Sequence, residues 1–106
     1  MARLQIHPQA RLDGAEIFDY LASRSSAAAA RFPDAVEEAY RRIKADPKLG
    51  MRLHRPDRGE QDWRFRRIPG FENYLVYFLI GSDVTTIVRV LHGSRDVESA
   101  LRSRGE

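Results

Sequence analysis

The side chains best suited to chemistry are one histidine and a group of arginines. His92 and Arg95 lie three residues apart near the C-terminus, and Arg64 and Arg66 alternate along a segment upstream. Planar guanidinium groups bind carboxylates and phosphates alike, and an imidazole can transfer a proton near neutral pH. Together these groups could hold a scissile phosphate of RNA and stabilise the charge that develops on it. The same groups would equally suit a basic surface that binds another macromolecule without chemistry.

The segment around His92 has the pattern of a strand-to-helix corner. Its β-branched residues predict a strand over 84–92, and the glycine that follows breaks the strand. Ser94 or Asp96 can then cap a short helix predicted over 97–101. Such a corner would hold His92 in place and leave it accessible.

Each of these residues also has a purely structural interpretation. The His92 ring can tie down the corner through hydrogen bonds, and Arg95 can pair with Asp96 or with the helix end. Arg89 lies in the middle of the predicted strand, where it either pairs with a carboxylate or reaches solvent. Trp63 opens another predicted strand and is expected in the core, packed on the helices.

Size and composition indicate one domain over residues 1–106. The chain is 42% hydrophobic, enough for one core, and its lack of cysteine excludes disulfides and thiolate metal sites. Its three histidines (His7, His54 and His92) are scattered, and neither a zinc motif nor a glycine-rich phosphate loop occurs. We therefore expect no metal and no cofactor. No apolar run resembles a signal peptide or a membrane span, which points to the cytoplasm.

Arginine dominates the charge of the chain, which has a formal net charge of +3 and a pI near 9.7. Arginines crowd one short stretch: Arg52, Arg55, Arg58, Arg64, Arg66 and Arg67. An acidic protein segment and a nucleic acid are the two partner classes that suit such a stretch. A solvated basic face is the alternative.

Hydrophobic periodicity predicts an α+β fold with the order β-α-α-β-β-β and a short C-terminal helix. The expected strands are 3–7, 63–68, 74–80 and 84–92. The expected helices begin at Pro8 and near residue 27, and the second runs through Pro33. About four residues join them, so they should form an antiparallel hairpin packed on one face of a mostly antiparallel four-stranded sheet. Residues 51–62 are expected to be a loop, and the other face of the sheet is free to carry Arg64 and Arg66.

The first predicted helix is more apolar than one buried stripe requires. The surplus residues, which suggest a groove for a partner, are Ile17, Phe18, Tyr20 and Leu21. Tyr40 on the second helix is better suited to the core than to an interface, yet it lies where it can contribute to the same groove. Gly14 costs the first helix roughly 1 kcal/mol relative to alanine, and we expect a neighbouring helix to approach closely there.

Several motifs follow one another along the chain: Asp19-Tyr20-Leu21-Ala22, Asp46-Pro47-x-x-Gly50, Arg66-Arg67-Ile68-Pro69, Tyr74-Leu-Val-Tyr-Phe78 and Val90-Leu-His-Gly-Ser-Arg-Asp96. With these motifs the chain resembles the ParE toxins of the RelE/ParE superfamily, the toxic halves of bacterial toxin–antitoxin pairs. The resemblance covers nearly the whole chain, and the last motif is its most specific part. It implies two helices packed against a mostly antiparallel four-stranded sheet.

The resemblance also implies two possible activities. ParE-like members are implied to inhibit DNA gyrase by trapping its cleaved complex with DNA, without chemistry of their own. RelE-like members, the alternative, are mRNA endonucleases that act in the ribosomal A site. Arg64, Arg66 and Arg95 match three of the nuclease positions, but the third strand does not open with arginine and no tyrosine follows Tyr77. The gyrase inhibitor is therefore favoured.

Two surfaces are expected from this resemblance. The target-binding residues would be Arg64, Arg66, Arg89, His92 and Arg95. In a nuclease the catalytic residues would be Arg64, Arg66, His92 and Arg95. The antitoxin-binding residues would be Ile17, Phe18, Tyr20, Leu21 and Tyr40. The partner would be a ParD-like antitoxin in a hetero-oligomer, with an apolar helix on this groove and an acidic C-terminal segment that meets the arginines.

Overall fold

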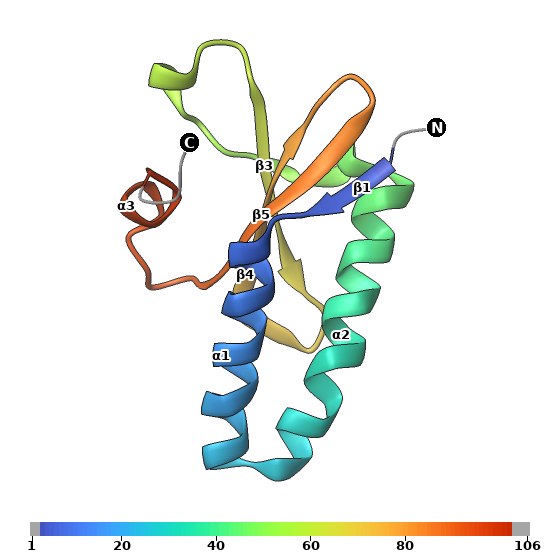
Figure 1. Ribbon diagram of the computed structural model, residues 1–106, viewed down its shortest axis with the longest axis vertical. Coiled ribbons are helices and arrows are strands. Elements are labelled where there is room, and N and C mark those ends of the chain that lie inside the picture. The colour runs from blue at the N-terminus through green and yellow to red at the C-terminus, as the bar shows by residue number, and fades with distance from the viewer. Residues whose placement is uncertain (1–2, 103–106) are drawn as a thin grey trace.

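A five-stranded mixed sheet forms the centre of the computed structural model, which describes residues 3–102 (Figure 1). The strands are β1 (Arg3–Ile6), β2 (Met51–Arg52), β3 (Asp62–Ile68), β4 (Phe71–Ile80) and β5 (Val84–His92), in the order β1-β5-β4-β3-β2. β1 is parallel to β5, and the other neighbouring pairs are antiparallel. The α+β class is as predicted, but the predicted four-stranded sheet lacked one strand.

β2 is the strand that the sequence did not indicate. Met51 and Arg52 pair with β3 inside the segment predicted to be a loop, and the Leu53 amide donates to the Trp63 carbonyl at 2.8 Å. Two residues are too few to show an alternation of polar and apolar side chains. These residues therefore form a strand because they pair with the otherwise free edge of β3.

The helices α1 (Pro8–Arg24) and α2 (Ser26–Ala45) form the predicted antiparallel hairpin and lie side by side in Figure 1. Ser25 alone joins them, so the connection is shorter than the four residues expected. Its amide donates to the Leu21 carbonyl at 2.7 Å, which ends α1. Its hydroxyl accepts from the Ala28 amide at 3.2 Å, which caps α2.

Close packing of the backbone, expected at Gly14, occurs at Gly50 instead. A Cβ atom on Gly14 would meet nothing within 4 Å, so the prediction for Gly14 was wrong. On Gly50 it would lie 2.5 Å from Cζ of Phe78, a distance too short for real atoms. Glycine therefore allows the chain to pass over the Phe78 ring as it enters β2. The helix α2 itself runs through Pro33 as predicted.

The larger core lies between the helix hairpin and one face of the sheet. Its buried residues are Ala10, Phe32, Ala39, Ile43, Ile68, Val76, Phe78, Ile87 and Val90. Arg64 and Arg66 lie on this same face, because they stand opposite Phe78 and Val76 in the β3–β4 register. The prediction that these arginines occupy an uncovered face was wrong. The predicted alternation along β3 is confirmed. The face that packs on the hairpin, however, is the one with Ile68, and the face with Trp63 points away from it.

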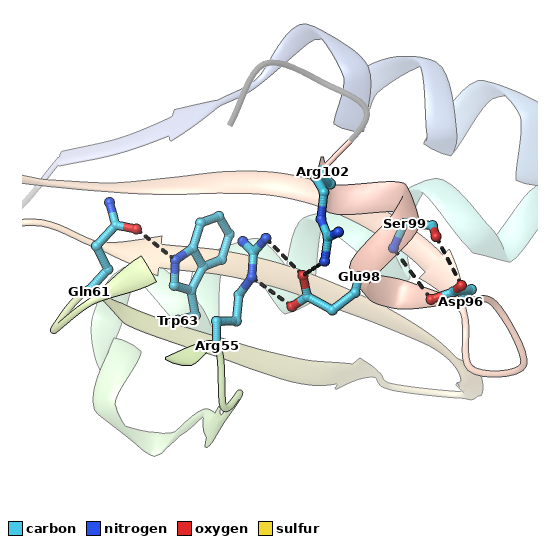
Figure 2. Close-up of polar contacts among 7 residues, drawn as sticks. All are labelled: Arg55, Gln61, Trp63, Asp96, Glu98, Ser99 and Arg102. Atoms are coloured by element: carbon cyan, nitrogen blue, oxygen red, sulfur yellow. Dashed lines mark hydrogen bonds and ion pairs between the residues drawn. The ribbon is translucent and has the colours of Figure 1, made fainter. Parts of the chain in front are cut away.

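The second face of the sheet is covered as well. The short helix α3 (Val97–Arg102) contributes to a smaller core there, whose buried residues are Trp63, Leu75, Tyr77, Val88, Leu91, Ala100 and Leu101. Trp63 is thus in the core as predicted, but on the side of α3. Arg55 lies between Trp63 and α3 (Figure 2): its guanidinium carbon is 4.3 Å from the centre of the indole, and its Nε donates to Glu98 at 2.9 Å. These contacts fasten α3 to the sheet.

Candidate functional site

The corner after β5 combines a fixed backbone with an exposed histidine. The Gly93 amide donates to the Asn73 carbonyl at 2.7 Å, and the Arg95 amide donates to the His92 carbonyl at 3.0 Å. Nδ1 of His92 accepts from the Ser94 amide at 3.1 Å and lies 2.8 Å from the Ser94 hydroxyl. The interpretation that the ring ties down the corner is therefore confirmed. The ring is nevertheless exposed.

The orientation of the His92 ring leaves its second nitrogen available. Because Nδ1 accepts the Ser94 amide proton, a neutral ring carries its own proton on Nε2. No partner for Nε2 occurs among residues 3–102. The Tyr74 ring stands perpendicular to the imidazole, with the ring centres 5.2 Å apart, and supports it from the neighbouring strand. The corner thus presents one N–H donor in a defined direction.

Asp96 caps α3 and does not pair with Arg95. The Ser99 amide donates to Asp96 Oδ1 at 3.3 Å, and the Ser99 hydroxyl donates to Oδ2 at 2.9 Å (Figure 2). Of the two predicted caps, Asp96 is therefore correct, since Ser94 is engaged with His92. The Arg95 side chain is exposed and has no hydrogen bond or ion pair within the described part of the chain.

Arg64 and Arg66 have different environments although they are two residues apart on β3. Nε of Arg64 lies 2.9 Å from Asp62, and its Nη1 donates to the carbonyl of Gly50 at 2.9 Å and to that of Lys48 at 3.0 Å. Burial alone would raise the pKa of the Asp62 carboxyl, but the hydrogen bond and charge of Arg64 hold that pKa below its usual range. Arg64 is therefore engaged within the fold. Arg66 is half-buried and has no polar partner among residues 3–102.

Arg89 is buried and forms an ion pair, which does not fit the target-binding role expected for it. Its Nε lies 2.7 Å from Asp13 Oδ2, and its Nη1 donates to the Ala100 carbonyl at 2.8 Å. Asp13 and Arg89 are each only 4% exposed. Of the two structural interpretations of Arg89, pairing with a carboxylate is confirmed. The Arg89 side chain is therefore not accessible to a target.

Asp13 also completes the hydrogen bonding of the sheet. β1 pairs with β5 only as far as Ile87, so beyond that residue no strand of residues 3–102 lies beside the outer edge of β5. The Val90 amide on this edge donates to Asp13 Oδ2 at 2.9 Å. One carboxylate of α1 thus satisfies both a buried cation and a strand amide. This arrangement fixes α1 against the strand that ends at the corner.

An open cavity of about 730 Å³, here called the α1–β4 groove, joins the two predicted surfaces. Its lining includes Ile17, Tyr20 and Leu21 from α1, Phe71 and Tyr74 from β4, and His92 from β5. The sequence indicated the α1 residues and His92 separately, and it missed Phe71 and Tyr74. The strand predicted over 74–80 begins three residues earlier in the structure, at Phe71.

Phe18 and Tyr40, also expected at the antitoxin surface, do not line the groove. Phe18 is exposed on α1, and Tyr40 is half-buried against the larger core. Burial raises the pKa of Tyr40 from its ordinary 10.0 to about 12, with Arg11 acting in the opposite direction and Asp13 in the same direction. Tyr40 therefore contributes mainly to the packing of the larger core and not to the groove.

This pKa predicts a loss of stability in alkali. Above pH 10 the unfolded chain releases the Tyr40 proton while the folded chain keeps it, so the free energy of unfolding falls as the pH rises from 10 to about 12. The contribution of this one group is about 2–3 kcal/mol across that interval. Denaturant unfolding of the parent and of Tyr40→Phe at pH 7, 10 and 12 would measure it. Equal alkaline losses in the two proteins would contradict the assignment.

Within residues 3–102, no group of three or more histidine, aspartate or glutamate side chains is placed to hold a metal ion. In the same range, none of the helices combines the length and apolar character that crossing a membrane requires.

Comparison with known protein families places most of the chain in a family model. The model for the ParE toxin of the type II toxin–antitoxin system parDE matches residues 4–97. The chain belongs to the ParE toxin family. This ParE-family toxin accordingly belongs to a type II system, in which an antitoxin is its partner. The matched residues run from β1 to the first residue of α3, and they include both the corner and the α1–β4 groove. A comparison with curated proteins gave no match.

Proposed function

We propose that this ParE-family toxin inhibits DNA gyrase in the cytoplasm through the His92–Arg95 corner, and that a ParD-like antitoxin neutralises it. The observation that carries the proposal is that the corner is both exposed and held in one shape. Binding to a surface that is already ordered costs little conformational entropy. The imidazole N–H and the Arg95 guanidinium can then meet acceptor groups on a large partner.

The internal contacts of Arg64 favour a binding surface over a catalytic centre. Arg66 stands opposite Val76, and His92 stands opposite Tyr74 on the other side of β4. Two strand spacings and a two-residue offset separate their Cα atoms by roughly 12 Å. Acid–base catalysis requires groups within hydrogen-bond reach of the reacting atoms. Long side chains can meet across such a distance, so the separation alone does not decide; it is the engagement of Arg64 within the fold that makes the mRNA endonuclease the less supported alternative.

The deciding experiment incubates the purified toxin with DNA gyrase, ATP and supercoiled plasmid. We expect linear DNA to accumulate as the cleaved complex is trapped. Loss of two exposed polar contacts in His92→Ala/Arg95→Ala should raise the toxin concentration needed by about tenfold or more. Arg31→Ala, which changes an exposed arginine on α2, is the matched control and should act like the parent.

The same preparation is tested for ribosome-dependent cleavage of a translated mRNA. Unchanged gyrase supercoiling and cleavage, with cuts in the message that follow the codon phase, would overturn the proposal in favour of the endonuclease. Unchanged gyrase activity without RNA cuts would also refute it. Equal potency of the double variant and the parent would remove the corner from the proposed interface.

A further inference from the structure

The α1–β4 groove has an aromatic lining. The rings of Tyr20, Phe71, Tyr74 and His92 reach it, and Ile17 and Leu21 supply its aliphatic surface. Half of the Tyr20 side chain is exposed, and the guanidinium carbon of Arg24 lies 5.0 Å from the centre of its ring. Tyr20 therefore already has a cation over one face, an arrangement that aromatic rings favour through their electron-rich faces.

The charge of the groove is opposite to that of the chain as a whole. Two carboxylates, Glu16 and Glu72, line it, and no lysine or arginine of the described residues 3–102 is part of the lining. Glu72 is held in place because one of its carboxylate oxygens accepts the Gly70 amide at 3.0 Å. Arg67 donates to the main-chain carbonyl oxygen of Glu72 at 2.9 Å and not to its carboxylate. Both carboxylates are therefore available to a partner.

We propose that the α1–β4 groove binds an antitoxin segment that brings a lysine or arginine side chain between Glu16 and Glu72, with an apolar neighbour on Ile17 and Leu21. This inference rests on the proposed antitoxin partner and specifies its chemistry. The expectation drawn from the sequence was an apolar helix on this groove and an acidic segment that meets the arginines; the inference adds a cationic side chain to the part that occupies the groove. Acidic groups placed here would meet two carboxylates, which is unfavourable. They belong instead near the arginines outside the groove.

The position of the groove also links its occupant to inhibition. His92 is part of the lining, and the residue after it begins the turn that carries Arg95. A peptide segment that fills the groove would lie against the imidazole. The antitoxin segment would therefore hide one of the two corner residues proposed to contact the target.

The test measures binding of the full-length toxin to the antitoxin encoded by the neighbouring gene, by titration calorimetry. Glu16→Lys reverses one charge in the groove, and Glu72→Gln removes the other while keeping an oxygen that can accept the Gly70 amide. Glu37→Lys on exposed α2 is the matched control. We expect Glu16→Lys to weaken binding by about tenfold or more, Glu72→Gln by about threefold or more, and Glu37→Lys to have no effect.

A charge-swap experiment tests the occupant itself. Each lysine and arginine of the antitoxin is changed to glutamate in turn, and one of these variants should bind Glu16→Lys more tightly than it binds the parent toxin. If both groove variants bind the antitoxin as tightly as the parent does, the groove inference fails while the antitoxin partner stands. If none of these antitoxin variants binds Glu16→Lys more tightly than it binds the parent toxin, the occupant is not cationic and the inference is wrong. If the parent toxin does not bind this antitoxin, the proposed partner fails, and the inference fails with it.

Discussion

Replacing Asp13 by alanine is expected to lower the free energy of unfolding by about 3–5 kcal/mol, because the change leaves the buried Arg89 guanidinium without its counter-charge. The pair is close, at 2.7 Å between Arg89 Nε and Asp13 Oδ2 and at 2.9 Å between Nη2 and Oδ1. The Val90 amide would lose its acceptor at the same time, which adds the cost of an unsatisfied buried donor. Urea unfolding at neutral pH would measure the loss.

Asp19→Ala is the matched control for this prediction, because Asp19 lies on the same helix and is exposed. It should change the free energy of unfolding by less than about 0.5 kcal/mol. The double variant Asp13→Leu/Arg89→Met removes both charges and should recover a large part of the stability, since a buried pair is often replaceable by apolar residues. A loss in Asp13→Ala no larger than that in Asp19→Ala would show that the pair does not hold α1 to β5.

Arg55→Ala is expected to lower the free energy of unfolding by about 2–4 kcal/mol through the loss of an ion pair to a partly exposed Glu98, a ring contact and the packing of a buried side chain. The Arg55 side chain is fully buried, and its guanidinium donates to both oxygens of Glu98, at 2.9 and 3.3 Å. Its stacking on Trp63 connects that contact to the smaller core (Figure 2). Denaturant unfolding would measure the change.

Hydrogen exchange would show whether the effect of Arg55 reaches α3. The Ala100 amide, bonded to the Asp96 carbonyl at 3.1 Å, should exchange faster in Arg55→Ala than in the parent, because α3 loses the tie that its Glu98 makes to Arg55. Arg52→Ala, a change at an exposed arginine of the same segment, should alter neither stability nor exchange. Unchanged protection of Ala100 in Arg55→Ala would mean that α3 is held by its apolar contacts alone.

The order of the main elements was predictable because it depends on neighbours in the chain. The helix hairpin, the three antiparallel strands and the cap at Asp96 all follow from local periodicity, turn residues and side chains that bond to nearby amides. The hydrogen bonds of the His92 ring belong to this class, since they join it to Ser94, two positions away. The bond from the Gly93 amide to the Asn73 carbonyl, which also fixes the corner, does not. The same locality explains why the family resemblance was visible in short motifs.

The face on which each β3 side chain lies was decided only by the tertiary structure. An alternating strand shows which residues share a face, but not which face the helices will cover. Here α3 and Arg55 cover the face of Trp63, and the hairpin covers the face of Arg64 and Arg66. The environment of each arginine likewise depends on distant partners. Arg89 meets Asp13 across 76 positions, and Arg55 meets Glu98 across 43.

The sequence by itself determined the family, the major helices and strands, and a histidine corner that is exposed and locally braced. The tertiary structure decided which arginines remain available, and it brought α1 and β4 together with His92 in one acidic, aromatic groove. The physical reason is the range of the interactions. Caps, turns and periodicity act over a few residues, whereas ion pairs and cavities depend on how whole elements pack against one another.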